Sequence, residues 1–291
     1  MKVHLVDGTY ELFRYFFAVP SHLDQKGAEA GALRGVLGTV LSLLENGATH
    51  IGVATDHIVE SFRNELYDGY KSGEGIDPDL FGQFHPLEDA LEAMGVTVWR
   101  MKEYEADDGL ASASALAWAD PRVEQILLLT PDKDLAQCVQ GNRVVMVDRR
   151  KNMILDESGV QEKFGVYPAS IPDYLALVGD TADGFPGLKG WGAKSAATIL
   201  DRWLVLEEIP DSPEDWDVKI RGAERLATSL REGRKDAALF KDLATLRTSA
   251  DVGQSPDEWA WSGPRPEFRS ICDSLRASSL AERAQRLIDK R

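Results

Sequence analysis

The residues of this sequence most suited to chemistry are carboxylates, which stand at positions where several of them could bind the same cation. The stretch "EYEADDGLASA" (103–113) places Glu105, Asp107 and Asp108 at the start of a predicted helix. Acids in a first helical turn complement the helix dipole by roughly 0.3–1 kcal/mol each, which is one interpretation. Glu105 and Asp108 share a helix face, while Asp107 lies about 100° around from Asp108. The trio could therefore reach more than one metal ion.

Further acids follow three apolar, strand-like runs. Asp7 follows 3–6, Asp56 follows 50–55, and Asp132 and Asp134 follow 123–130. Ligand sites in open α/β sheets form beyond the carboxyl ends of the strands, so these side chains are expected to converge there. Two carboxylates about 4 Å apart repel by roughly 4 kcal/mol at an effective dielectric constant near 20. Oxygen ligands without obvious His or Cys partners favour Mg²⁺ or Mn²⁺ over zinc.

The surrounding pattern predicts a parallel sheet with helices on both faces. Helical periodicity covers 31–47 and 84–95, and further strands are expected at 96–99 and 143–148. Continuous apolar strands that alternate with helices are typical of such sheets. Three tryptophans in apolar patterns are expected in the core: Trp99, Trp118 and Trp203.

A second motif combines acids, glycines and lysines in "LVGDTADGFPGLKGWGAKSAATIL" (177–200). Asp180 and Asp183 add two carboxylates. A glycine-rich turn can approach phosphates closely, and a following helix start provides free N–H groups. The residues that would serve such binding are Gly187, Lys189, Gly190, Gly192, Lys194 and Ser195. A loop of ordinary turn glycines is the alternative.

The composition of the chain limits the compartments and binding partners that it can have. The chain has 291 residues and a formal net charge of −15. It contains two cysteines, so a disulfide framework is not expected, and a reducing cytoplasm is the expected compartment. Asp7 breaks the first apolar run, which does not fit a signal peptide, and no membrane association is expected. Residues 219–247 hold eight bases against four acids, either a DNA-backbone contact or a solvated helical surface. The five His show no ligand pattern in the sequence.

Together these motifs resemble the bacterial 5′-nuclease (flap endonuclease) family, and in particular the N-terminal nuclease domain of DNA polymerase I and its free-standing relatives. The matching segments are "LVDGTYELFR", "SFRNELYDGYK", "YEADDGLA", "TPDKDLAQ" and "GDTADGFPGLKGWGAKSAA". The resemblance implies an α/β PIN-like nuclease core over 1–165 with a helical arch near 61–85. It also implies a helical helix-three-turn-helix subdomain over 166–252, and 253–291 would form a helical tail.

The resemblance also implies a mechanism. Two or more Mg²⁺ (or Mn²⁺) ions would be held by nine acids: Asp7, Asp56, Glu105, Asp107, Asp108, Asp132, Asp134, Asp180 and Asp183. Lys71 would act on the scissile phosphate and Tyr70 would stack on a base. The glycine-rich turn would grip a DNA backbone, with a K⁺ ion near 187–192. The expected partner is DNA with a 5′ flap or a free 5′ end next to duplex, bound by a monomer that associates with the nucleoid.

The sequence departs from the family pattern in three places. Glu74 stands near the position of an expected arch Arg, so Arg63 or another residue would have to supply that cation. Gly184 replaces a usual Asn, and Pro131 a usual Gly.

The chain is therefore predicted to be a metal-dependent, structure-specific 5′-3′ exonuclease and flap endonuclease of replication or repair. Two rivals stay open: a PIN-type ribonuclease, and a DNA-end-binding protein with weak or no turnover.

Overall fold

A computed structural model describes residues 1–289, and the chain forms two compact units that interleave along the sequence. Unit 1 comprises Met1–Val59, Gly73–Thr130 and the described residues from Arg247 onward. Unit 2 comprises Glu60–Ser72 and Pro131–Leu246. The predicted domain boundaries (1–165, 166–252 and 253–291) rest on sequence segments rather than on contacts, and they stay a prediction.

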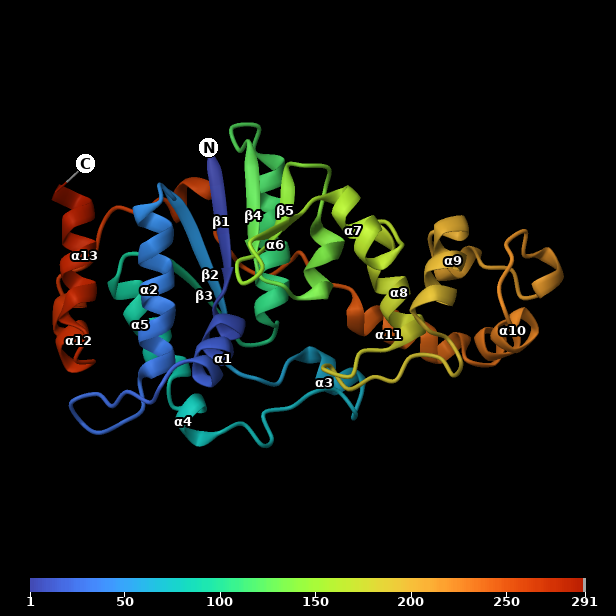
Figure 1. Cartoon of the computed structure of the whole chain (residues 1–291), viewed down its shortest axis with the longest axis horizontal. Coiled ribbons are helices and arrows are strands. Elements are labelled where there is room, and N and C mark those ends of the chain that lie inside the picture. The colour runs from blue at the N-terminus through green and yellow to red at the C-terminus, as the bar shows by residue number, and fades with distance from the viewer. Residues whose placement is uncertain (290–291) are drawn as a thin grey trace. The chain divides into compact units, whose positions relative to one another are not determined.

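Unit 1 is built on four parallel strands, which confirms that part of the expected fold (Figure 1). They are β1 (Lys2–Asp7), β2 (His50–Asp56), β3 (Thr97–Met101) and β4 (Gln125–Leu129), in the order β3-β2-β1-β4. Leu5 pairs with Gly52 on one side and Leu128 on the other. Apolar strand residues on this register are fully buried, so the centre of unit 1 excludes water: Val3, Leu5, Ile51, Val53 and Leu128.

Unit 1 also contains helices, some of which pack on the strands and some on other helices. They are α1 (Gly8–Ala18), α2 (Gly31–Glu45), α4 (Pro78–Phe81), α5 (Phe84–Ala93), α6 (Ala106–Ala119), α12 (Phe268–Ser274) and α13 (Ser278–Asp289). Helix α6 packs against all four strands, whereas α5 packs against β2 and β3. The strand order runs outward from β1 to β3 and then returns to β4, so right-handed crossovers place α5 and α6 on opposite faces. The order reverses between β1 and β4, which is where α/β sheets bind ligands.

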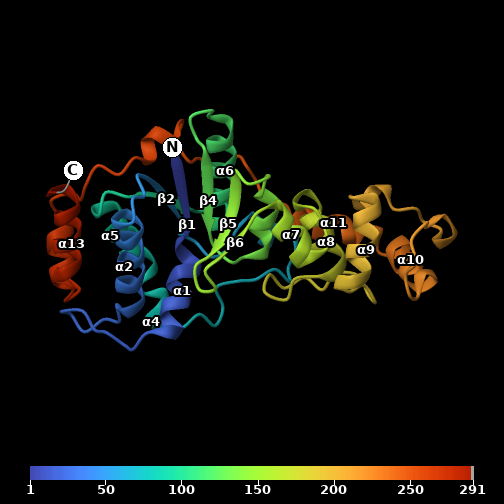
Figure 2. The same cartoon turned by 45° about the horizontal axis from the view of Figure 1, so that its top comes forward.

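Unit 2 is mainly helical (Figure 2). Its helices are α3 (Phe62–Leu66), α7 (Glu157–Phe164), α8 (Ile171–Val178), α9 (Ala193–Trp203), α10 (Ala223–Glu232) and α11 (Arg234–Ala244). The short 3₁₀ helix η1 spans Lys133–Cys138. Helices α8 and α11 pack together, and the Phe185 ring stacks on Phe240 at a centroid distance of 5.6 Å. This confirms the expected helical C-terminal part.

Some sequence predictions fail in detail. Strand β5 (Val144–Asp148) was expected, but β6 (Met153–Leu155) was not, and β6 runs antiparallel to β5. The chain reverses before β6 through Asn152 at φ 50°, which makes β6 the antiparallel strand of a mostly parallel sheet. Trp99 is buried as expected, but Trp118 is 38% exposed, because its position on α6 faces solvent.

The expected arch segment, 61–85, contains two short helices, α3 and α4, followed by the start of α5. The residues between α3 and α4 form turns and bends rather than a long helix. None of the helices in residues 1–289 is long and apolar enough to cross a membrane.

Gly184 has a physical reason to be glycine. Its φ of +89° lies in the left-handed region, and a Cβ there would come within 2.2 Å of the Gly69 carbonyl oxygen. The adjacent Lys71 N–H donates to the Asp183 carbonyl at 3.0 Å. Any side chain at Gly184 would therefore push the 69–71 segment away from Asp183.

We predict that Gly184→Ala destabilises the protein by about 1–3 kcal/mol, because strained backbone and a steric clash add together. Thermal and denaturant unfolding would measure this change. Gly75→Ala is the matched control, because Gly75 also has positive φ (+83°) but nothing lies within 4 Å of its Cβ position. Equal effects of the two substitutions would contradict the role given to close packing against Gly69.

Candidate metal centre and nucleic-acid surface

Asp7 stands at the carboxyl end of β1 and is held there by two hydrogen bonds. It is the N-cap of α1, and its Oδ1 accepts the Tyr10 N–H at 2.8 Å. Its Oδ2 accepts the Thr130 hydroxyl at 3.0 Å, from the residue just after β4. Asp7 is buried, so its carboxylate is held in place at the β1–β4 switch point.

Asp56 and the start of α6 form the rest of the acidic group in unit 1. The Asp56 Oδ1 accepts the Ala106 N–H at 2.7 Å, which ties β2 to the start of α6. Asp108 is fully buried, and its carboxylate accepts the backbone N–H groups of Glu105 and Arg247. Asp107 is partly exposed. Capping and ligand roles are compatible here, because each carboxylate oxygen has two lone pairs.

Unit 2 contains a closely packed carboxylate trio. One oxygen atom from each of Asp134, Asp180 and Asp183 lies within 4.8 Å of the others, and all three residues are buried. Asp132 caps the start of η1, where its Oδ1 accepts the Asp134 N–H at 3.0 Å. Within residues 1–289, the five acids of unit 1 form no trio as close as this one.

Two lysines offset the repulsion within the trio. Lys71 Nζ lies 2.9 Å from Asp183 Oδ1, and Lys133 Nζ pairs with Asp180 and lies 3.6 Å from Asp134 Oδ1. Burial lowers the pKa of Lys133, but the surrounding carboxylates, Asp134 first, raise it by more, so the net shift is upward. Burial and the neighbouring acids Asp132, Asp183 and Asp180 raise the pKa of Asp134 well above its usual range.

One atom in this trio lacks a hydrogen-bond partner. Asp134 Oδ1 is buried and has none among the described residues. A buried carboxylate oxygen without a donor is costly, whereas a hard divalent cation bound there would satisfy it. The donor set is all oxygen, which fits Mg²⁺ or Mn²⁺. The residues present therefore fit a divalent metal ion.

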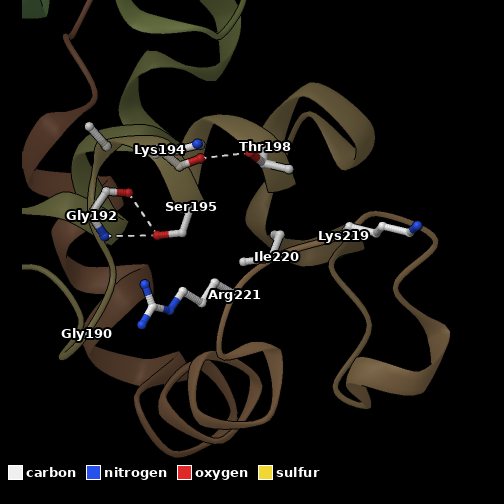
Figure 3. Close-up of a pocket in the computed structure, with 9 residues that line it drawn as sticks. Gly190, Gly192, Lys194, Ser195, Thr198, Lys219, Ile220 and Arg221 are labelled. Carbon is white, nitrogen blue, oxygen red and sulfur yellow. Dashed lines mark hydrogen bonds between the residues drawn. The ribbon is translucent and has the colours of Figure 1, made fainter.

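The glycine-rich turn lines a pocket of about 710 Å³ at the start of α9 (Figure 3). The Gly192 N–H donates to Ser195 Oγ at 3.0 Å, and the Ser195 hydroxyl returns a bond to the Gly192 carbonyl. Lys194, Lys219 and Arg221 line the pocket, and no carboxylate does. Figure 3 shows the Arg221 side chain directed toward Gly192 and Ser195, while the Lys219 amine extends away. This surface is suited to a phosphate.

The structure does not favour the predicted roles of two other residues. Tyr70 is 5% exposed and Lys71 Nζ lies 5.5 Å from its ring centroid, so the ring is not open for base stacking in this conformation. Arg63 is 1% exposed, and its guanidinium donates to the carbonyls of Leu243 and Thr245 at 2.7 and 3.3 Å. These contacts give Arg63 a structural role in joining α3 to the end of α11.

Several residues at these sites escaped the sequence interpretation. Lys133 lies inside the "TPDKD" motif, where its proximity to Asp180 could not be foreseen. Arg221 was part of the basic stretch, but the pattern did not single it out. His57, His85 and Glu88 come together although the five His showed no ligand pattern. The available signals were the position of His57 directly after Asp56 and the i,i+3 spacing of His85 and Glu88 on α5.

We predict that Arg63→Ala lowers the stability of the protein by about 2–4 kcal/mol, because buried carbonyls lose a charged donor. Chemical denaturation would measure the change, with the exposed Arg150→Ala as control. Should Arg63→Ala unfold like the wild type yet lose DNA cleavage, the structural role would be wrong and a catalytic one would stand.

Comparisons with known proteins agree with this geometry. Residues 2–165 match the 5′-3′ exonuclease N-terminal resolvase-like domain, and residues 166–267 match the 5′-3′ exonuclease C-terminal SAM fold. DNA polymerase I of Pseudomonas aeruginosa is 35% identical over 264 residues, which are 87% of this chain but 28% of the polymerase. A 5′-3′ exonuclease of Buchnera aphidicola subsp. Schizaphis graminum is 30% identical, over 87% of this chain and 89% of its own length.

Solved structures share the fold. A bacteriophage T5 flap endonuclease crystallised with DNA and metal ions has a TM-score of 0.67 and 18% identity, over 99% of this chain and 98% of that one. The two matching segments cover nearly the whole chain, and their order is that of the family. The chain therefore belongs to the 5′-3′ exonuclease family.

Proposed function

We propose that this protein is a structure-specific 5′ nuclease that trims 5′ flaps and degrades duplex DNA from 5′ ends in replication or repair. Family membership supports the class of reaction. The observation that carries the proposal is the buried Asp134–Asp180–Asp183 trio, in which Asp134 Oδ1 has no hydrogen-bond partner among the described residues. Without a bound cation, such a group of buried charges would lower the stability of the protein.

Nine carboxylates are proposed to hold two or more Mg²⁺ or Mn²⁺ ions. Unit 1 supplies Asp7, Asp56, Glu105, Asp107 and Asp108, and unit 2 supplies Asp132, Asp134, Asp180 and Asp183. When bound, such ions activate water and stabilise the leaving oxygen in phosphodiester hydrolysis. A K⁺ ion near 187–192 stays a separate prediction.

Lys71 is proposed to contact the scissile phosphate. Its ammonium already lies beside Asp183, and its side chain is 35% exposed, so a substrate phosphate can reach it. A lysine acts there as a point charge that favours the negative charge developing on the phosphate. The Asp183–Lys71 backbone bond holds its Cα in place before substrate arrives.

The pocket at the start of α9 is proposed to grip one strand of a DNA duplex. Lys194, Arg221 and the free N–H groups of the α9 N-terminus offer phosphate contacts without reaching any base edge. Such contacts fix position and carry no sequence information, so recognition of a junction rather than a sequence follows.

Cleavage of a 5′-labelled flap duplex tests the proposal. We expect cutting near the junction with Mg²⁺, none in EDTA, and little cutting of the single strand alone. Asp132→Asn should lower the rate by at least about 10²-fold while flap binding persists, because the fold and the phosphate contacts remain. Gel-based cleavage and fluorescence anisotropy would measure the two effects.

The outcomes separate the rivals. Tight flap binding by the wild type without product would replace this proposal with an end-binding protein. Faster cutting of a matched RNA substrate would favour a ribonuclease. Full activity of Asp132→Asn would remove the carboxylate assignment.

We also predict that Arg221→Ala weakens duplex binding about equally for unrelated sequences, and lowers the salt-dependence slope by roughly 0.9 if one phosphate contact is lost. Anisotropy titrations at several KCl concentrations would show this. Lys26→Ala, an exposed position in unit 1, is the control. An unchanged slope for Arg221→Ala would exclude a phosphate contact at this residue.

A further inference from the structure

His57, His85 and Glu88 meet at the surface of unit 1, and none of them belongs to the nine carboxylates named above. His57 directly follows β2, while His85 and Glu88 lie one turn apart on α5. Their ligand atoms lie within 4.8 Å of one another, and the Glu88 side chain is fully buried. We propose that these three residues bind a transition-metal ion of the Zn²⁺ type.

The distances suit such an ion. His57 Nδ1 lies 2.8 Å from Glu88 Oε2 and 3.1 Å from His85 Nδ1, and His85 Nδ1 lies 3.6 Å from the same carboxylate oxygen. Zinc bonds of about 2.05 Å in a tetrahedron place neighbouring ligand atoms about 3.3 Å apart. The three separations bracket that value, so the spacing of the three ligand atoms fits a single ion.

Hydrogen bonding alone satisfies this group poorly. The rings of His57 and His85 meet edge to face, with centroids 4.3 Å apart and their Nδ1 atoms facing each other. A single Nδ1 proton on His57 would have to serve both Glu88 and His85, because a neutral imidazole carries one N–H. A metal ion would instead take one ligand atom from each of the three residues, and two imidazoles with one carboxylate are a usual zinc set.

Neighbouring groups are compatible with a cation. Arg100 lies 3.7 Å from Glu88 Oε2, but it also pairs with Asp89 at 2.8 Å and Glu92 at 3.2 Å, which offset its charge. The Thr55 hydroxyl donates to Glu88 Oε1 at 2.8 Å and orients the carboxylate, as supporting residues do around bound metals.

An ion at this position would affect the strand end that presents Asp56. The His57 N–H donates to the Met101 carbonyl at 2.9 Å, so the backbone just after Asp56 is already tied to the end of β3. A metal ion would tie the same point to α5 as well. The His85 side chain is 49% exposed, so the ion has a route from solvent and room for a water ligand. The ion would thus stabilise the strand end that presents Asp56.

Co²⁺ is the probe, because its visible absorption distinguishes four-coordinate sites with nitrogen ligands from octahedral oxygen sites. The protein is titrated with Co²⁺ in excess Mg²⁺, which occupies the carboxylates. We expect one equivalent with a four-coordinate spectrum, displaced by Zn²⁺. His85→Gln should weaken this binding by at least about 100-fold, since even supporting residues cost 10–100-fold. His50→Gln, at the opposite end of β2, should bind as the wild type does.

Thermal unfolding gives a second readout that does not depend on nuclease activity. Zn²⁺ should raise the unfolding temperature of the wild type and of His50→Gln, but not of His85→Gln, because a ligand stabilises the state that binds it. Equal Co²⁺ titrations of the wild type and His85→Gln, or a spectrum that Mg²⁺ abolishes, would overturn the proposed site.

Discussion

Repulsion among buried carboxylates is the constraint on which this structure depends. Asp134, Asp180 and Asp183 lie close together away from water, and Asp132 adds a fourth charge beside them. Lys71 and Lys133 neutralise part of that negative charge, yet Asp134 Oδ1 has no hydrogen-bond donor among the described residues. Apolar residues in place of this buried group of charges would make the protein more stable. The presence of the acids therefore indicates a bound cation.

The backbone is arranged to keep these acids in place. Three acids of unit 1 end a strand or stand in a first helical turn, where a backbone N–H group holds the carboxylate: Tyr10 for Asp7, Ala106 for Asp56 and Glu105 for Asp108. In unit 2, the left-handed Gly184 lets the 69–71 segment approach Asp183, which carries Lys71 to the same carboxylate. The elements that position the acids thus also position the residue proposed to contact the phosphate.

Much of this could be predicted from the sequence because it depends on local pattern. Continuous apolar runs in the sequence predict the four parallel strands, and Asp7 and Asp56 stand at the ends of two of these runs. The β5–β6 reversal and the exposure of Trp118 depend on packing that no run of residues records. The contacts of Arg63 could not be predicted for the same reason, since its partners, Leu243 and Thr245, are about 180 residues away. The approach of His85 to His57 likewise arises only when α5 packs on β2.

The most direct test compares thermal unfolding of the wild type and Asp134→Asn, each in EDTA and in Mg²⁺. We predict that Asp134→Asn is the more stable protein in EDTA, by about 1 kcal/mol or more, because a buried charge is removed from a repulsive group. We also predict that Mg²⁺ stabilises the wild type and has much less effect on Asp134→Asn. A less stable Asp134→Asn in EDTA, together with an equal Mg²⁺ response of both proteins, would contradict a metal ion at this trio.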